Sequence, residues 1–128
     1  MRSVLVSAAF SVFVLAACGG SSGGTDHHAT CKPAGTRLHV EAQGFKFDTD
    51  CLAAPADEAF TIELDNHDSG VPHNVDIMTS ADGDTVFKGD VIDGVKTVTY
   101  HVKAMKPGTY RFRCDVHPST MQGTFIVS

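Results

Sequence analysis

Three side chains near the end of the chain have types that suit a soft metal ion. Cys114, His117 and Met121 occur within eight positions, directly after a run over residues 110–113 that alternates like a β-strand. The parity of that run places Cys114 on the inward face, at the end of the strand. A lone buried cysteine is often only a small core residue. A thiolate, an imidazole and a weak thioether on one loop, however, form a ligand set that suits copper.

A blue-copper site of this type needs a second histidine. The candidates are His39, His67, His73 and His101. His39 and His101 take the polar parity of their strands, which predicts surface positions. His67 and His73 flank one loop, and His73 directly precedes the short predicted strand 74–77. Parity favours His73 but leaves His67 open.

The residues around these positions resemble the cupredoxin family, the superfamily of plastocyanin and azurin. The resemblance rests on Val-Pro-His-Asn over residues 71–74 and on Tyr-x-Phe-x-Cys-x-x-His-Pro-x-x-Met-x-Gly over residues 110–123. In order and spacing it extends over residues 36–128, and the chain looks most like small plastocyanin-like lipoproteins of bacteria. One departure is Asp115, which stands where many members carry Thr or Ser after the cysteine.

The resemblance implies one copper ion that alternates between Cu(I) and Cu(II). It implies that His73, Cys114 and His117 form the trigonal plane of ligands, with Met121 as the long axial ligand. It also implies that His117 presents its ring edge near the surface, as the exit for the electron. A site with all four positions filled leaves none open for a substrate, so we expect a protein that is not an enzyme.

The domain as a whole has the pattern of an all-β protein. Apolar and polar residues alternate with a period of two in several short runs, separated by the turn signals Asp-Gly-Asp, Asp-Gly and Pro-Gly. This pattern predicts an antiparallel Greek-key β-sandwich or barrel, which is also the fold that the resemblance implies. The inward positions that the pattern predicts are Leu38, Val40, Ala42, Phe45, Phe47, Phe60, Ile62, Leu64, Val98, Tyr100, Val102, Tyr110, Phe112, Phe125 and Val127.

The N-terminal segment has the pattern of an export signal. Arg2 precedes the uncharged apolar run 4–17, which is too short to span a membrane and has the length of a signal-peptide core. The run ends in Leu-Ala-Ala-Cys at residues 15–18, which resembles the lipobox of bacterial lipoproteins. We therefore expect residues 1–17 to be a signal peptide and Cys18 to carry lipid. Lipid on Cys18 anchors an exported protein to a bacterial membrane, on the periplasmic or extracellular face.

Residues 18–30 follow as the lipidated cysteine and a flexible Gly/Ser-rich linker, and residues 31–128 form one domain. Without Arg2 the chain has 9 basic and 15 acidic residues, a formal charge of −6. No basic patch suggests a nucleic-acid partner. We expect a monomeric domain whose partners are a protein electron donor and a protein electron acceptor.

The number of cysteines predicts one disulfide. If Cys18 carries lipid, three cysteines remain in an exported domain, where disulfides form readily. Cys31 and Cys51 flank the first predicted strands. Pairing them closes a loop of about 20 residues and contributes about 3 kcal/mol. Cys114 is then the free thiol.

Three functions compete on these observations. The first is a membrane-anchored type 1 copper protein that carries single electrons between redox partners outside the cytoplasmic membrane. The second is an extracytoplasmic protein that sequesters or delivers copper. The third is a structural or binding module without metal, which requires the spacing of the four candidate ligands to be coincidental. Cys114 at the end of a strand favours the first.

Overall fold

The structure is a computed structural model, and it describes residues 29–128. The expected signal peptide, the expected lipid site Cys18 and most of the expected linker lie outside the described residues. Within residues 29–128 no helix is long and apolar enough to cross a membrane. The strands of the described part are β1 Arg37–Gln43, β2 Lys46–Phe47, β3 Cys51–Ala54, β4 Phe60–Asn66, β5 Asp76–Met78, β6 Thr85–Lys88, β7 Lys96–Val102, β8 Gly108–Arg113 and β9 Gln122–Val127.

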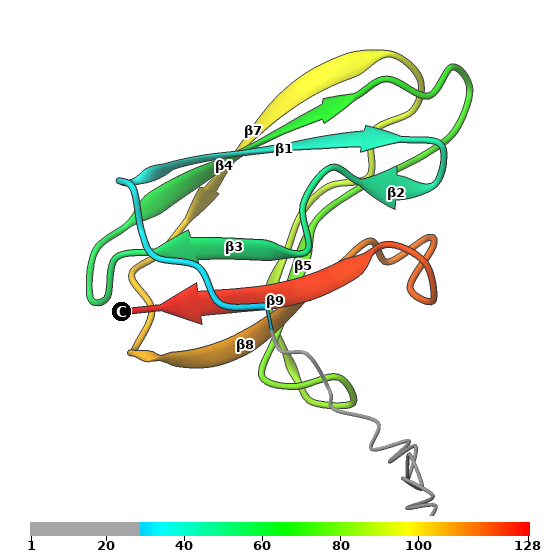
Figure 1. The fold of residues 1–128 in the computed structure, drawn as a ribbon. Coiled ribbons are helices and arrows are strands. Elements are labelled where there is room, and N and C mark those ends of the chain that lie inside the picture. Colours follow the sequence, from blue (N-terminus) through cyan, green and yellow to red (C-terminus); the bar gives the residue numbers. More distant parts are fainter. Residues whose placement is uncertain (1–28) are drawn as a thin grey trace, which may run out of the picture.

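These strands form two sheets that face each other, as Figure 1 shows. One has the order β2-β1-β4-β7 and the other the order β3-β9-β8-β5-β6. The prediction of an all-β sandwich is confirmed. The pairing is mixed rather than wholly antiparallel, because β1 runs parallel to β4 and β3 runs parallel to β9. Alternation along one strand carries no information about the direction of its neighbour, so the sequence pattern could not reveal these two pairs.

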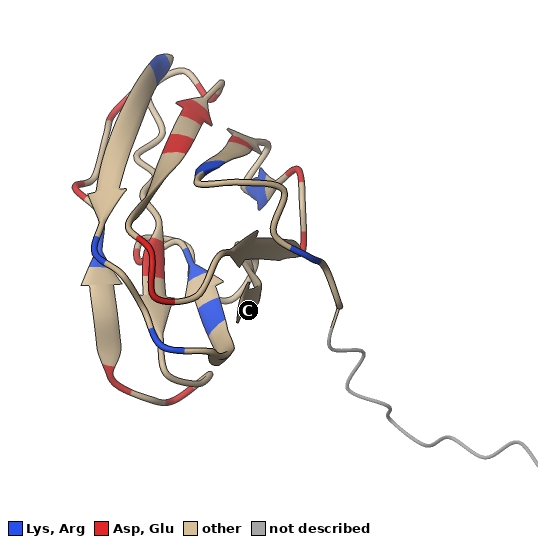
Figure 2. Cartoon of the chain, turned by 90° about the vertical axis from the view of Figure 1, so that its left-hand side faces the viewer, with Lys and Arg blue, Asp and Glu red and all other residues tan. Residues whose placement is uncertain are grey.

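The period-two pattern produces the core. In β4 the inward residues Phe60, Ile62 and Leu64 are buried, and the outward residues between them are half-buried or exposed. Figure 2 shows acidic and basic residues spread over both sheets and their loops. Phe45 departs from the prediction: it lies in the turn between β1 and β2, has a φ of 60° and is 49% exposed.

The candidate ligands lie at one end of the sandwich, where two of them are part of the core. Cys114 and Met121 belong to the same buried cluster as Phe112, Val75 and Ile77. The described part of the chain has five buried polar or charged residues, and four of them lie at or next to this end. These four are Asn66, His73, Asn74 and Asp76. Buried polar groups are generally hydrogen-bonded, and here their partners are backbone groups, Asp68 and one another.

The structure also contains the disulfide between Cys31 and Cys51 that the cysteine count predicts. It attaches the segment before β1 to the first residue of β3, which pairs with Thr124 of β9. Cys114 is the free cysteine of the described residues, and it is buried.

Gly123 is required where β9 leaves the candidate site. A Cβ at this position would lie 2.4 Å from the ring of Phe112 and 2.5 Å from the carbonyl oxygen of Asp50. Gly123→Ala is therefore expected to lower the free energy of unfolding by about 1–3 kcal/mol, the usual cost of overpacking. Denaturant unfolding of the copper-free protein measures it. Gly108→Ala is the control, because a Cβ at position 108 would lie 3.3 Å from its nearest neighbour, an atom of the Tyr110 ring. Equal effects of the two variants would contradict the expectation.

Candidate metal centre

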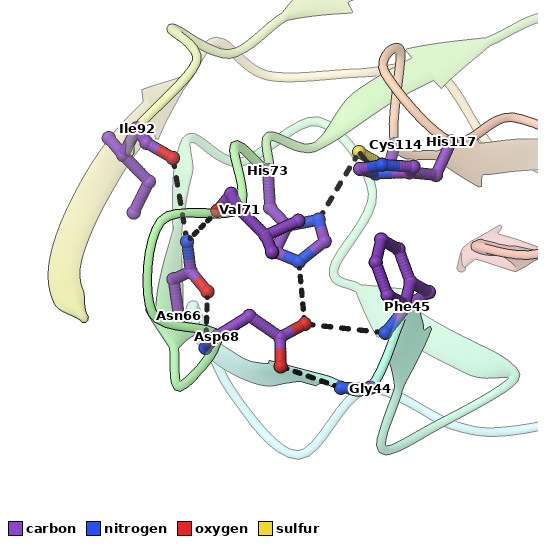
Figure 3. A network of polar contacts seen from close by, with 9 residues as sticks. All are labelled: Gly44, Phe45, Asn66, Asp68, Val71, His73, Ile92, Cys114 and His117. Atoms are coloured by element: carbon purple, nitrogen blue, oxygen red, sulfur yellow. Dashed lines mark hydrogen bonds and ion pairs between the residues drawn. The ribbon is translucent and has the colours of Figure 1, made fainter. Parts of the chain in front are cut away.

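Three side chains from two distant segments of the chain meet at one end of the sandwich. His73, Cys114 and His117 place their ligand atoms within 4.8 Å of one another. Cys114 Sγ lies 3.8 Å from Nδ1 of His73 and 3.9 Å from Nδ1 of His117. Figure 3 shows both imidazole rings turned toward the sulfur. Each histidine thus presents the same nitrogen to one shared point beside the thiol.

The loop between β8 and β9 brings His117 and Met121 to Cys114. The N–H of Cys114 donates to the carbonyl oxygen of Met121 at 2.8 Å, and the N–H of Met121 donates to that of His117 at 3.0 Å. These two hydrogen bonds close the loop on itself. Met121 is fully buried, while His117 is partly exposed. The loop therefore has a fixed shape, with its methionine directed into the core and its histidine toward the surface.

A backbone contact with a distant segment of the chain positions His73 in the cluster. His73 forms an isolated antiparallel bridge with Ile92, with hydrogen bonds of 3.0 and 2.9 Å between the two backbones. Its side chain is completely buried. The other candidate, His67, lies at the surface and contacts Asp65 at 2.9 Å. Of the two histidines that parity left open, the structure brings His73 to Cys114. His39 and His101 are exposed, as their parity predicts.

The surface pair Asp65–His67 gives a prediction for pH. The hydrogen bond to Asp65 raises the pKa of His67 above its ordinary value of 6.5. Because the folded-state pKa is the higher one, the stability from this pair is complete below pH 6.5 and is lost as the pH rises through the folded-state pKa. An NMR titration of the copper-free protein is expected to give a pKa above 6.5 for His67, and Asp65→Asn is expected to lower it. A pKa that Asp65→Asn leaves unchanged would contradict this assignment.

A carboxylate that the sequence analysis missed lies behind His73. Asp68 Oδ2 is 2.9 Å from Nε2 of His73, and the Asp68 side chain is only 14% exposed. Hydrogen bonds, first from the N–H of Gly44 and then from His73, lower the pKa of Asp68 below 3.8. The carboxylate is therefore charged at neutral pH. The sequence pattern does not predict the hydrogen bond between Asp68 and Gly44, because the two residues are 24 positions apart.

Asn74 connects the segment of His73 to the ligand loop. Its side-chain oxygen accepts the N–H of Asp115 at 2.8 Å, and its amide group donates to Asp76 at 2.9 Å. The carboxylate of Asp115 forms ion pairs with Lys88 and Arg113. The hydrogen bond from Lys88 lowers the pKa of Asp115. Two cations thus oppose the negative charge that Asp115 brings next to Cys114.

The chemistry of the cluster identifies the metal that it fits. Two imidazole nitrogens and one thiol sulfur converge at a site where only His117 is partly exposed, and the fully buried Met121 closes the same loop. No carboxylate of residues 29–128 belongs to this group of ligand atoms, which removes the hard oxygen donors that magnesium and calcium prefer. Two histidines and a cysteine with a methionine nearby form the ligand set of blue-copper centres. The residues fit one copper ion.

The fold and this site together define a metal-binding β-sandwich of the blue-copper class. The chain belongs to the cupredoxin-like family: the family model described as "Cupredoxin-like domain" matches residues 7–127. No curated protein sequence matches the chain.

Solved structures of blue-copper proteins have the same fold. Auracyanin from Roseiflexus castenholzii is 16% identical, with a TM-score of 0.64, over 73% of this chain and 97% of that chain. Auracyanin A from Chloroflexus aurantiacus, titled a "blue" copper protein, is 19% identical, with a TM-score of 0.64, over 73% and 99%. A reduced amicyanin mutant is 25% identical, with a TM-score of 0.53, over 71% and 81%.

Proposed function

We propose that this protein is a type 1 copper protein that carries single electrons between protein partners outside the cytoplasmic membrane. In this proposal His73, Cys114 and His117 bind the ion as close ligands, and Met121 is the weak axial ligand. The observation that carries the proposal is the convergence of the two Nδ1 atoms on the buried Cys114 Sγ, at 3.8 and 3.9 Å. Copper supplies the one-electron couple, because this mixed ligand set is acceptable to both Cu(I) and Cu(II).

The protein's own part in electron transfer is to keep the ligands still. His73 is held by its backbone bridge to Ile92, and Cys114 is held by the hydrogen bond from its N–H to Met121. Because Cys114 and Met121 are also packed into the core, gain or loss of an electron requires little movement of either residue. A site that reorganises little suits rapid electron exchange better than it suits release of the metal.

His117 is the proposed exit for the electron. His73 is completely buried, whereas His117 is partly exposed on the loop between β8 and β9. Of the two histidines, only His117 therefore offers exposed surface to a protein partner that docks at this end of the sandwich. The donor and acceptor are proposed to be redox proteins, and lipid on Cys18 is proposed to keep the domain at an extracytoplasmic membrane surface. The lipobox-like segment 15–18 supports this location.

Redox cycling tests this function. The blue protein is expected to bleach when ascorbate reduces it and to regain its full colour when ferricyanide oxidises it, over repeated cycles and without loss of copper. Copper content after each cycle is the necessary parallel measurement. Release of copper on reduction, or transfer of Cu(I) to a chelator at the rate of bleaching, would instead favour the sequestration or delivery of copper.

A further inference from the structure

The carboxylate of Asp68 is the meeting point of three hydrogen-bond donors at the candidate site. Its Oδ1 accepts the N–H of Gly44 at 2.8 Å, and its Oδ2 accepts the N–H of Phe45 at 3.3 Å. The same Oδ2 lies 2.9 Å from Nε2 of His73. Figure 3 shows the carboxylate between the β1–β2 turn and the His73 ring. A single side chain thus links the turn to a candidate ligand.

The contact with Asp68 determines which nitrogen of His73 carries the proton. Both oxygens of Asp68 accept backbone N–H groups, so the carboxylate acts as a hydrogen-bond acceptor and Nε2 of His73 is the nitrogen that donates to it. In the neutral ring Nδ1 is then unprotonated, and this is the atom 3.8 Å from Cys114 Sγ. Outer carboxylates of this kind fix the tautomer and orientation of metal-binding histidines and make them stronger donors.

Asp68 also controls the turn that carries Phe45. Gly44 and Phe45 both have a φ near 60°, at 61° and 60°. Glycine adopts this conformation freely, but a residue with a side chain is strained there. The hydrogen bonds to Asp68 offset this strain. The ring of Phe45 lies edge-on to His117, with centroids 5.1 Å apart, and 6.4 Å from the ring of His73.

Asp68 is itself positioned by a hydrogen bond to a buried residue. Its N–H donates to Oδ1 of Asn66 at 2.9 Å, and Asn66 is completely buried. The amide group of Asn66 donates to the carbonyl oxygens of Val71 and Ile92. Ile92 is also the backbone partner of His73. The position of Asp68 is therefore fixed by the same backbone that positions His73.

We propose that Asp68 is a positioning residue for both histidines of the copper site. It holds the proton of His73 on Nε2, leaves Nδ1 free for the metal, and fixes the turn that places Phe45 against His117. Its negative charge stabilises Cu(II) more than Cu(I), which lowers the reduction potential. The copper part of this inference rests on the proposed function, whereas the hold on His73 exists in the copper-free protein as well.

The test compares Asp68→Asn with Asp65→Asn in the purified full chain. The control is closely matched, because Asp65 also lies 2.9 Å from a histidine Nε2, that of His67, but at the surface and outside the cluster. Each variant removes one negative charge. An asparagine at position 68 has one oxygen for three donors, so at least one of Gly44, Phe45 and His73 loses its partner.

Three measurements are made on each protein. Nitrogen-15 NMR of the copper-free protein gives the tautomer of His73 and the ring-proton shifts of His117. Titration gives the affinity for Cu(II), and voltammetry gives the reduction potential. Asp68→Asn is expected to weaken Cu(II) binding by about 10–100-fold, as loss of an outer partner of a ligand usually does. If Cu(II) binding weakens tenfold more than Cu(I) binding, the potential rises by about 59 mV.

The proposal predicts that copper-free wild-type protein carries its His73 proton on Nε2. It also predicts that only Asp68→Asn raises the potential and moves the His117 ring shifts. Protonation of His73 on Nδ1, or equal potentials in Asp68→Asn and Asp65→Asn, would overturn it. If Asp68→Asn does not fold, the wild-type tautomer alone decides. If the wild-type protein forms no blue copper site, the proposed function fails, and the NMR result still tests the role of Asp68.

Discussion

Changing Cys114 to serine is expected to abolish the visible colour of the copper-loaded protein. The intense absorption of such a site arises from charge transfer between a thiolate and Cu(II), and a serine hydroxyl cannot replace the soft, electron-donating sulfur. Cys114 is the free cysteine of the described residues, and its Sγ lies 3.8 Å from Nδ1 of His73 and 3.9 Å from Nδ1 of His117. Because serine is close to cysteine in size, the fold should survive. Absorption spectra of the variant and the parent, at equal copper load, measure the effect.

Thr120→Ala is the matched control for Cys114→Ser. It changes an exposed side chain of the same loop and leaves the four candidate ligands in place. It is expected to keep the colour of the parent. A Cys114→Ser protein that stays blue would refute the thiolate assignment, and with it the copper site proposed here.

Removing His73 is expected to abolish tight copper binding, whereas removing His67 is not. His73 is completely buried with its Nδ1 directed at Cys114 Sγ, and His67 lies at the surface against Asp65. The loss of Cu(II) affinity in His73→Ala should exceed the 10–100-fold that loss of an outer partner costs, because a direct ligand is removed. Isothermal titration of both variants with Cu(II) measures it.

Copper-free unfolding experiments separate binding from stability in this pair. His73→Ala removes a completely buried side chain and one of the three hydrogen-bond donors to Asp68, and it is expected to lower the free energy of unfolding by about 1.5–3 kcal/mol, the usual contribution of a hydrogen bond to a charged group. His67→Ala removes only an exposed contact and should unfold almost like the parent. If the two variants exchange their copper affinities, the wrong histidine has been assigned.

The alternation of apolar and polar residues along the strands predicts much of the core correctly. It placed Phe112 and Cys114 on the inward face, and both are fully buried. It failed for Phe45, because the β1–β2 turn interrupts the alternation and turns that ring toward His117. A period-two pattern cannot distinguish a turn residue of positive φ from the next inward residue of a strand.

The remaining parts of the site depend on contacts between distant segments. The choice between His67 and His73 follows from the backbone bridge of His73 to Ile92, which no local pattern encodes. Asp68 acquires its role only when the β1–β2 turn folds against it, 23 and 24 positions along the chain. Cys114, His117 and Met121 could be predicted from the sequence because their spacing is local. The residues that orient the ligands could not be predicted in this way.

The most direct test of the proposed type 1 copper site is the electron paramagnetic resonance spectrum of the purified protein loaded with one equivalent of Cu(II), recorded together with its visible spectrum. We expect an intense blue band and a narrow copper hyperfine splitting, because electron density is shared with the sulfur of Cys114. A pale protein with the wide splitting of ordinary Cu(II), or a protein that takes up no Cu(II), would contradict it.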